Sequence, residues 1–303
     1  MRLVTYTEGN AHRLGAMLDD ATVVDLARAA HGELPDTIIP FLAGGDDARE
    51  AARRMLAMTS DRVVTHRDEL TAAGIVRTLS GTDVALAAPV PRPGKVLAIG
   101  LNYRDHAEET NAQIPERPVV FAKMPTCITG PGAPVHLPKV SKALDWEGEL
   151  CFVIGRGGRH ISAADAMSHV AGYCIGNDLS VRDWQSHSPT WMMGKGFDTH
   201  GPLGPWLTTR DEIEDVNNLD VKTWVNDELV QSSNTRSLIF NIPAIIEYLS
   251  AAFTLEPGDV VFTGTPAGVG VARKPPRFLK AGDTVRVEIS GLGVLENTVV
   301  DEP

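Results

Sequence analysis

The chain has 303 residues and carries 28 Lys and Arg against 39 Asp and Glu, a formal net charge of −11 with His neutral. This excess of acids argues against a nucleic acid or an anionic membrane surface as a partner, because both require clustered positive charge. Hydrophobic residues at 43% and charged residues at 22% are ordinary for a folded globular protein and exclude a disordered chain.

Cysteine usage and apolar run length predict the compartment. Cys127, Cys151 and Cys174 are too few and too dispersed for a disulfide framework or a zinc site. Polar residues follow Met1 too soon for a signal peptide. Apolar runs such as 151–154 are far shorter than the roughly 20 residues that span a bilayer. We therefore expect a cytoplasmic protein without a membrane segment.

The first part of the chain is rich in alanine and charged residues. Its patterns predict short strands over 2–6 and 21–26, and helices over 46–57 and 67–79. This mixture favours a small α/β unit.

A proline-rich segment, residues 88–94, follows this unit. Its three prolines exclude a helix and a central strand. We predict a small N-terminal α/β domain over 1–90 and a larger, mainly β domain over 91–303. The alternative is a surface loop within a single domain.

A helix start is predicted after this boundary, in the segment 102–109. Asn102 or Asp105 can cap a helix that places His106 and Glu109 three residues apart, within contact. A carboxylate beside an imidazole orients it and raises its basicity, as a general base requires. The alternative is an exposed helix end whose acids complement the helix dipole.

Two glutamates lead into the apolar run 151–154, which predicts a buried strand. Side chains two positions apart face the same way on a strand, so Glu147 and Glu149 should project side by side. Gly148 between them allows close backbone approach on the other face. Paired buried carboxylates are costly without a cation, and a hard divalent ion such as Mg²⁺ suits them. The alternative is a solvated strand end.

Another strand, 171–175, leads into a second polar group. If a helix starts there, Asp178, Arg182 and Gln185 lie on one face at i, i+4 and i+7. Such a face combines a third metal ligand with a pair that binds a carboxylate. An N-cap and an ordinary surface ion pair are the alternative.

The rest of the chain alternates with a period of two. Residues 219–225 turn at Asn226–Asp227 into a second strand, which predicts a hairpin. Gly-Asp turns precede β-branched runs at 258–262 and 282–287, and 241–253 has helical periodicity. We predict a mixed, strongly bent β architecture with few helices.

Two glycine-containing segments complete the candidate site. Lys195 lies among glycines in 194–199, where a lysine can approach a ligand. The loop 264–270 lacks the endings of a P-loop and of a dinucleotide fold, which excludes nucleotide binding. Its backbone N–H groups and the Thr265 hydroxyl could hold a carboxylate.

Taken together, these motifs resemble the fumarylacetoacetate hydrolase family over residues 95–300. Five motifs in family order make the resemblance specific. They are Gly100–His106, Glu147–Glu149, Gly176–Gln185, Gly194–Thr199 and Gly264–Gly270.

The resemblance implies the mixed β-sandwich roll of that family, in an α+β, mainly β chain with a small leading domain. It implies Mg²⁺ or Mn²⁺, replaceable by Ca²⁺ in crystals, on Glu147, Glu149 and Asp178. It also implies a His106–Glu109 dyad that activates water and places Lys195 near a developing enolate. Substrate oxygens would be bound by Tyr103, Arg182, Gln185 and Thr265. A homodimer acting on a small oxo acid is implied too.

Two departures from the family pattern refine this expectation. Residues 99–102 lack the acid that the larger animal enzyme carries upstream of the histidine, which favours the smaller acylpyruvate-hydrolase-like branch. Gly196 replaces the serine of many relatives. We expect a metal-dependent hydrolase that cleaves a C–C bond of a 1,3-diketo acid. The alternatives are an oxaloacetate decarboxylase, an isomerase, a ureidoglycolate-lyase-type enzyme or a catalytically silent ligand-binding relative.

Basic residues are locally dense over 273–280. A solvated proline-rich loop explains them most simply. The alternative is an entrance that attracts anionic acids. Added salt would weaken this attraction.

Overall fold

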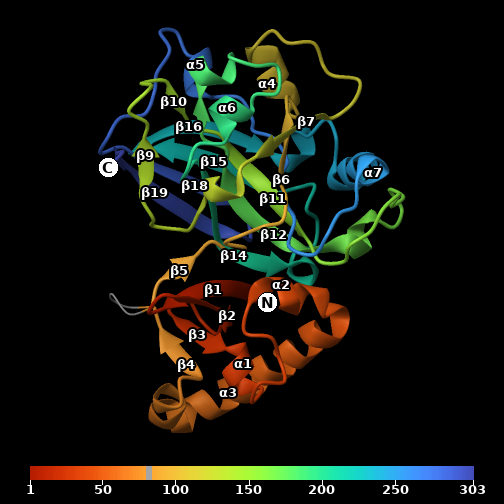
Figure 1. Ribbon diagram of the computed structural model, residues 1–303, viewed down its shortest axis with the longest axis vertical. Coiled ribbons are helices and arrows are strands. Elements are labelled where there is room, and N and C mark those ends of the chain that lie inside the picture. The colour runs from red at the N-terminus through yellow and green to blue at the C-terminus, as the bar shows by residue number, and fades with distance from the viewer. Residues whose placement is uncertain (80–83) are drawn as a thin grey trace.

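A mixed sheet of twelve strands is the main element in the computed structural model, which describes residues 1–79 and 84–303 (Figure 1). The strand order is β4-β3-β2-β1-β14-β12-β11-β17-β6-β7, with β5 beside β1 and β8 beside β14. The strands are β1 (Arg2–Glu8), β2 (Ala11–Met17), β3 (Thr22–Asp25), β4 (Val76–Thr78), β5 (Leu86–Ala87), β6 (Val96–Gly100), β7 (Val119–Lys123), β8 (Ile128–Thr129), β11 (Gly148–Ile154), β12 (Val170–Asn177), β14 (Gly201–Thr209) and β17 (Val260–Phe262).

Two smaller sheets complete the β structure of the described residues. The five-stranded sheet has the order β16-β15-β18-β19-β9, and β10 pairs with β13. The predicted hairpin is confirmed, because β15 and β16 pair across a turn in which Asn226 has a φ of 55°. The strands are β9 (Val135–Leu137), β10 (Leu144–Asp145), β13 (Ser180–Val181), β15 (Asp220–Val225), β16 (Glu228–Asn234), β18 (Thr284–Ile289) and β19 (Gly293–Asp301).

Helices are few and mostly short, as predicted. The helix predicted over 241–253 is confirmed as α7, where the Asn241 side chain caps the N-terminus by accepting from Ala244 N at 3.1 Å. Within residues 1–79 and 84–303, no helix has the length and apolar character to cross a membrane. The helices are α1 (Leu26–Ala29), α2 (Ile38–Ala43), α3 (Gly45–Ala72), α4 (Arg104–Glu109), α5 (Arg182–Gln185), α6 (Met192–Lys195) and α7 (Ile242–Ala252).

Strand β11 lies at the centre of the fold and is buried on both faces. Leu150, Phe152 and Ile154 pack with the five-stranded sheet and α7. Cys151 and Val153 pack on the opposite face, in a core that includes the N-terminal strands and helices. Because side chains alternate along a strand, this pattern also fixes the face from which Glu149 projects.

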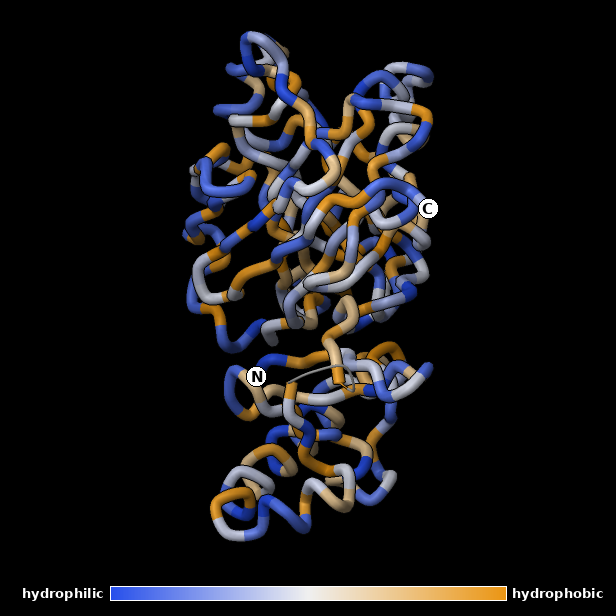
Figure 2. The backbone as a smooth tube through the Cα atoms, turned by 90° about the vertical axis from the view of Figure 1, so that its left-hand side faces the viewer, coloured by the Kyte–Doolittle hydropathy of each residue, from blue (hydrophilic) through white to orange (hydrophobic). Residues whose placement is uncertain are grey.

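The N-terminal part extends the large sheet. Arg2 and Leu3 of β1 pair with Thr208 and Leu207 of β14, and α1 and α3 lie toward the end of the molecule opposite α4–α6 (Figure 1). The tube in Figure 2 shows this part as the smaller, lower lobe. A division into two domains at residue 90 stays a prediction.

The two helices predicted in this part are wrong in detail. One helix, α3, covers residues 45–72 and is interrupted by the non-helical backbone of His66. Residues 76–78, which were predicted to be helical, form β4 and pair with β3. The local pattern favours a helix there, but edge pairing with β3 satisfies the backbone of this short segment instead.

Candidate metal centre and active site

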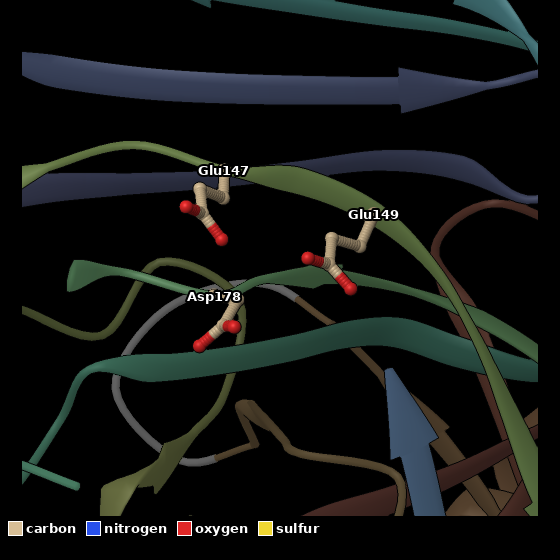
Figure 3. Close-up of side chains that lie close together, drawn as sticks. All are labelled: Glu147, Glu149 and Asp178. Carbon is tan, nitrogen blue, oxygen red and sulfur yellow. The ribbon is translucent and has the colours of Figure 1, made fainter. Parts of the chain in front are cut away.

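Three buried carboxylates meet at the ends of two neighbouring strands. Glu147 precedes β11, Glu149 lies in it, and Asp178 follows β12. Antiparallel pairing of Gly148 with Asn177 sets Asp178 opposite Glu147, where Asp178 N donates to Glu147 O at 2.8 Å. One oxygen from each carboxylate lies within 4.8 Å of the others, and Figure 3 shows the three side chains converging.

Gly148 allows the two glutamates to face this cluster together. A Cβ atom at position 148 would lie 2.2 Å from Thr223 Oγ1 of β15, so only glycine lets the five-stranded sheet pack this closely. The predicted projection of Glu147 and Glu149 from the same side, and the close approach at Gly148, are confirmed.

Three cationic side chains surround the carboxylates. Lys195 Nζ lies 2.6 Å from Glu147 Oε2 and 2.8 Å from Asp178 Oδ2. Lys123 Nζ, on β7, lies 2.6 Å from Asp178 Oδ1. Arg182 lies 2.7 Å from Glu147 Oε1 through Nη2 and 2.8 Å from Asp145 Oδ2 through Nε.

These cations do not neutralise the cluster completely. Burial by itself would raise the pKa of Glu147, but Lys195 and Arg182 outweigh it and lower that pKa to about 2. For Glu149, burial and the neighbouring Asp178 and Glu147 raise the pKa well above its ordinary value. Glu149 Oε2 accepts a hydrogen bond from Gly264 N at 2.7 Å, and among the described residues no cation is paired with it.

The donor set fits a hard divalent cation. With Asp145, four carboxylates face three cationic groups, so the cluster has one excess negative charge when all are ionised. A divalent ion would reverse this to one positive charge, and carboxylate oxygens are the ligands that such ions prefer. The raised pKa of Glu149 points the same way, because the metal-free cluster needs a proton where an ion could bind.

His106 and Glu109 lie in contact on α4. Their Nδ1 and Oε2 atoms are 3.3 Å apart, which confirms the predicted contact. The Glu109 carboxylate also accepts from Gly268 N at 3.0 and 3.1 Å, so the glycine-rich loop holds it in place.

The predicted helix cap for this dyad is wrong. Tyr103 occupies the N-cap position and makes no capping hydrogen bond. Asn102 bonds instead to Phe240 and Thr263, because these backbone groups approach it from the other side of the chain.

Arg182 and Gln185 lie on the short helix α5, and the prediction of a shared helix face with Asp178 is wrong. Residues 180 and 181 form β13, so the backbone between Asp178 and Arg182 is extended. Arg182 still reaches the cluster and donates from Nη1 to Gln185 Oε1 at 3.0 Å. Tertiary packing therefore brings these groups together without the i, i+4 spacing.

A cavity of about 250 Å³ contains most of the predicted site residues. Thr265 lines it, although its hydroxyl already donates to Gly148 O at 3.1 Å and accepts from Gln231 Nε2 at 2.8 Å. Asp178 lies behind the lining. The lining residues are Ile99, Gly100, Leu101, His106, Thr110, Ala112, Phe121, Glu147, Glu149, Arg182, Gln185, Trp191, Lys195, Thr265 and Val271.

Tyr103 does not line this cavity, so its predicted contact with substrate is not supported. Its side chain is completely buried, and its hydroxyl has no hydrogen-bond partner among the described residues. Tyr103 forms an isolated bridge with Leu238, and this pairing turns it into the interior.

Lys123 and Asp145 are functional-site residues that the sequence patterns did not reveal. Lys123 is fully buried and donates to the carbonyl oxygens of Lys195 and His200 as well as to Asp178. Its two-residue spacing from the inward-facing Phe121 on β7 was an available signal. Asp145 accepts from Gly270 N at 2.7 Å and Val271 N at 2.9 Å, and so anchors the glycine-rich loop beside Arg182.

Comparison with known proteins identifies the family. Residues 95–300 match the family described as "Fumarylacetoacetate (FAA) hydrolase C-terminal". A mitochondrial oxaloacetate tautomerase of Xenopus laevis is 43% identical over 99% of this chain and 90% of its own length. The chain therefore belongs to the fumarylacetoacetate hydrolase family, as its motifs predicted.

Solved structures of the same fold include enzymes named for two different reactions. A fumarylacetoacetate hydrolase from Exiguobacterium antarcticum superimposes with a TM-score of 0.81 at 31% identity and full coverage of both chains. A 5-carboxymethyl-2-hydroxymuconate delta-isomerase from Mycobacterium smegmatis does so with a TM-score of 0.76 at 34% identity, also with full coverage. The fold is therefore that of the family, and its relatives are enzymes of oxo-acid chemistry.

Proposed function

We propose that this member of the fumarylacetoacetate hydrolase family is a divalent-metal-dependent enzyme that interconverts the enol and keto forms of oxaloacetate. The observation that carries the proposal is the incompletely neutralised triad Glu147, Glu149 and Asp178 beside the His106–Glu109 pair. The name of the Xenopus relative, at 43% identity over nearly the whole chain, supports oxaloacetate as substrate. This choice replaces C–C hydrolysis, which the sequence favoured, as the first candidate.

The triad would hold Mg²⁺ or Mn²⁺. An ion bound there would act as a Lewis acid toward the 2-oxo group and make the adjacent C3 protons easier to remove. Lys195 is well placed to donate to the same oxygen, because its ammonium has three N–H groups and the two carboxylates occupy two of them.

His106 would move the proton. It lines the cavity. Glu109 holds the Nδ1 edge of its ring, which leaves Nε2 available to the substrate. The imidazole would take the C3 proton of the keto form as a general base, and the enolate oxygen at C2 would then receive a proton from the imidazolium or from water to give the enol. The reverse direction would run the same proton transfers backward. Gly268 N–H, by holding Glu109, keeps this orientation.

Arg182 and Gln185 would orient the substrate. Of its five N–H groups, Arg182 uses three toward Asp145, Glu147 and Gln185, and a planar guanidinium suits a carboxylate. Gln185 accepts from Arg182 through Oε1, so its amide nitrogen remains for the ligand. Thr265 positions the backbone at Gly148 and contributes to the cavity wall.

The test is the rate of enol–keto equilibration of oxaloacetate, followed by ultraviolet absorbance, after removal of metal and after addition of Mg²⁺ or Mn²⁺. We expect a protein-dependent rate that requires the ion and falls by about 10²–10⁴-fold in His106→Gln. Glu108→Gln, an exposed neighbour on the same helix, is the matched control. A rate that survives chelation, or equal rates in both variants, would refute the proposal.

Hydrolysis of a short acylpyruvate is the second candidate. The His106–Glu109 pair favours it, since the same base could deprotonate a water. Parallel assays with acetylpyruvate, and of carbon dioxide release from oxaloacetate, separate the reactions. His106→Ala should abolish hydrolysis and tautomerisation, whereas decarboxylation needs no attacking water.

A further inference from the structure

One wall of the cavity is apolar and is formed by residues outside the charged cluster. Leu101 follows the end of β6, Phe121 comes from β7, and Trp191 from the start of α6. The polar lining groups are committed to ions and substrate oxygens. A hydrocarbon tail on a substrate would therefore have to lie along this wall, because burying it against charges is unfavourable.

Trp191 is held rigidly in this wall. Its backbone has a φ of 59°, in the left-handed region, and it is the N-cap of α6. Its carbonyl oxygen accepts from Gly194 N at 2.9 Å and from Lys195 N at 3.1 Å. The indole and the Lys195 ammonium are thus carried by a single helical turn, with little freedom to move apart.

The indole rests directly on Gly100. A Cβ atom at position 100 would lie 2.3 Å from a ring carbon of Trp191, so the absence of a side chain there is what seats the ring. The other contact is with Phe121, edge to face at 5.5 Å. Lys195 Nζ in turn lies 5.1 Å from the centre of the Phe121 ring. Contacts therefore run from the carboxylates through Lys195 and Phe121 to Trp191.

The cavity that remains is small. Its volume of about 250 Å³ is below the roughly 300–1,000 Å³ of pockets for drug-sized ligands. A four-carbon oxo acid fits such a space beside an ion, whereas a long acyl chain needs the place that the indole fills.

We propose that Trp191, seated on Gly100, sets the upper length of the substrate, so that the site accepts short 2-oxo acids and excludes those with an extended acyl chain. This inference rests on the proposed oxo-acid chemistry. It assigns substrate selection to a residue that takes no part in proton transfer.

The experiment measures binding, which separates this inference from the reaction itself. Oxamate and its N-butyl and N-hexyl derivatives are unreactive analogues of 2-oxo acids with increasing tails. Their dissociation constants with the Mg²⁺-loaded protein are measured by calorimetry for the wild type, Trp191→Ala, Trp191→Leu and Trp191→Phe. The ratio of the N-hexyl constant to the oxamate constant reports tail exclusion.

We expect the wild type to bind oxamate at least about tenfold more tightly than N-hexyl oxamate, and Trp191→Ala to reduce that ratio about tenfold or more, since each methylene in an apolar pocket changes affinity by a similar factor. Trp191→Phe should keep most of the discrimination and Trp191→Leu should be intermediate. Equal affinities in the wild type overturn the inference.

An unchanged ratio in the variants overturns it too. If Trp191→Ala fails to fold, the Leu and Phe variants decide. Tail discrimination that depends on Trp191, in a protein without metal-dependent turnover of oxaloacetate or acetylpyruvate, would refute the proposed reaction and leave the selection rule standing. Turnover without discrimination between short and long tails would refute the selection rule and leave the proposed reaction standing.

Discussion

Two clusters of charged side chains, one in each part of the molecule, differ in how completely their charges are matched. In the N-terminal part, Glu8 and Asp25 are bound by three arginines, with Arg28–Glu8 and Arg13–Asp25 distances of 2.6 Å. Hydrogen bonding to Arg28 lowers the pKa of Glu8 to about 2. Asp25 is buried, which would raise its pKa, but Arg13 and Tyr6 lower it overall.

The cluster around the candidate metal centre is built from the same residue types but has a deficit of positive charge. Glu149 has a raised pKa and no paired cation, whereas each acid of the N-terminal cluster is paired with an arginine. The N-terminal cluster is partly exposed, with only Asp25 fully buried, whereas the side chains of the metal-centre cluster are almost completely buried. A cluster of acids therefore indicates an ion site when the neighbouring cationic side chains leave part of its negative charge uncompensated. Proximity of acidic side chains alone is not sufficient.

The largest expected effect follows from changing the uncompensated acid. Glu149→Gln should lower metal-dependent turnover by about 10³-fold, since an ion supplies several kcal/mol of stabilisation and each 1.36 kcal/mol is about tenfold in rate. The metal-free variant should be at least as stable as the wild type at neutral pH, because the metal-free wild type must either bury the Glu149 charge or bind a proton there, and the amide needs neither. Turnover and thermal unfolding with and without Mg²⁺ test both points.

Glu296→Gln, an exposed glutamate on β19, is the control for this change and should behave as the wild type. Metal-induced stabilisation that persists in Glu149→Gln would show that Glu149 is not a ligand and would break the comparison.

Removing a cation from the same cluster should instead destabilise the protein. Lys123→Met leaves one oxygen of Asp178 and two carbonyl groups without their buried donor. We expect a loss of about 3 kcal/mol in the free energy of unfolding, at the low end for breaking a buried pair because Lys195 still binds Asp178. Urea denaturation of the metal-free protein measures it, with exposed Lys142→Met as the control. A stable variant would mean that Lys123 is dispensable for folding.

In the N-terminal cluster, Asp25→Asn should reduce stability without touching catalysis. The buried carboxylate loses charge-assisted bonds to Tyr6 and Arg13, worth about 2 kcal/mol together. Turnover per folded molecule should be unchanged, and so should the stabilisation that Mg²⁺ produces. A change in either would mean that the two clusters are coupled and the contrast between them is wrong.

The contribution of Glu8 to stability should change with pH only in the acid range. Its pKa is about 2 in the folded protein against an ordinary 4.5, so the charged form stabilises the fold. This contribution is complete above the ordinary pKa and is lost as the pH falls toward 2. The stability difference between the wild type and Glu8→Gln should therefore be constant near neutrality and shrink below about pH 4.5. A difference that grows in acid would contradict the assignment.

The smallest effect concerns the basic segment near the C-terminus. Arg273, Lys274, Arg277 and Lys280 line a groove of about 1010 Å³, and Glu228 binds both arginines. If the two lysines attract anionic substrates, raising salt from low to physiological levels should increase the apparent KM about twofold in the wild type and less in Lys274→Gln. Equal salt dependence would assign the segment to the solvated surface.

Local periodicity predicted only part of the candidate metal centre. The two-residue spacing of Glu147 and Glu149 on a strand predicted their convergence, whereas the assignment of Asp178 as the third acid depended on the family resemblance. The i, i+4 spacing of Asp178 and Arg182 misled because the backbone at 180–181 is extended, and Arg182 contacts Glu147 and Asp145 instead. The burial of Tyr103 depended on a contact between distant segments, which no local pattern reports. For Lys123, local spacing indicated an inward-facing side chain but not its partners Asp178 and Lys195.

The same limit applies to the N-terminal part. Its strands could be predicted roughly, yet α3 continues where two helices were expected and β4 forms at the sheet edge. The short strands β3 and β4 have too little apolar alternation to specify their partners. Pairing across the whole chain decides their place.

That pairing has a consequence for the order of synthesis. On the edge of β1 that faces away from β2, Arg2 and Leu3 pair with Thr208 and Leu207, while Thr5 and Tyr6 pair with β5. During synthesis, the edge of β1 at Arg2 and Leu3 stays unpaired until some two hundred further residues have been made. Its partner on the other side, β2, is made directly after β1. A nascent chain therefore carries an open strand edge through most of translation, the type of surface that chaperones shield from premature association.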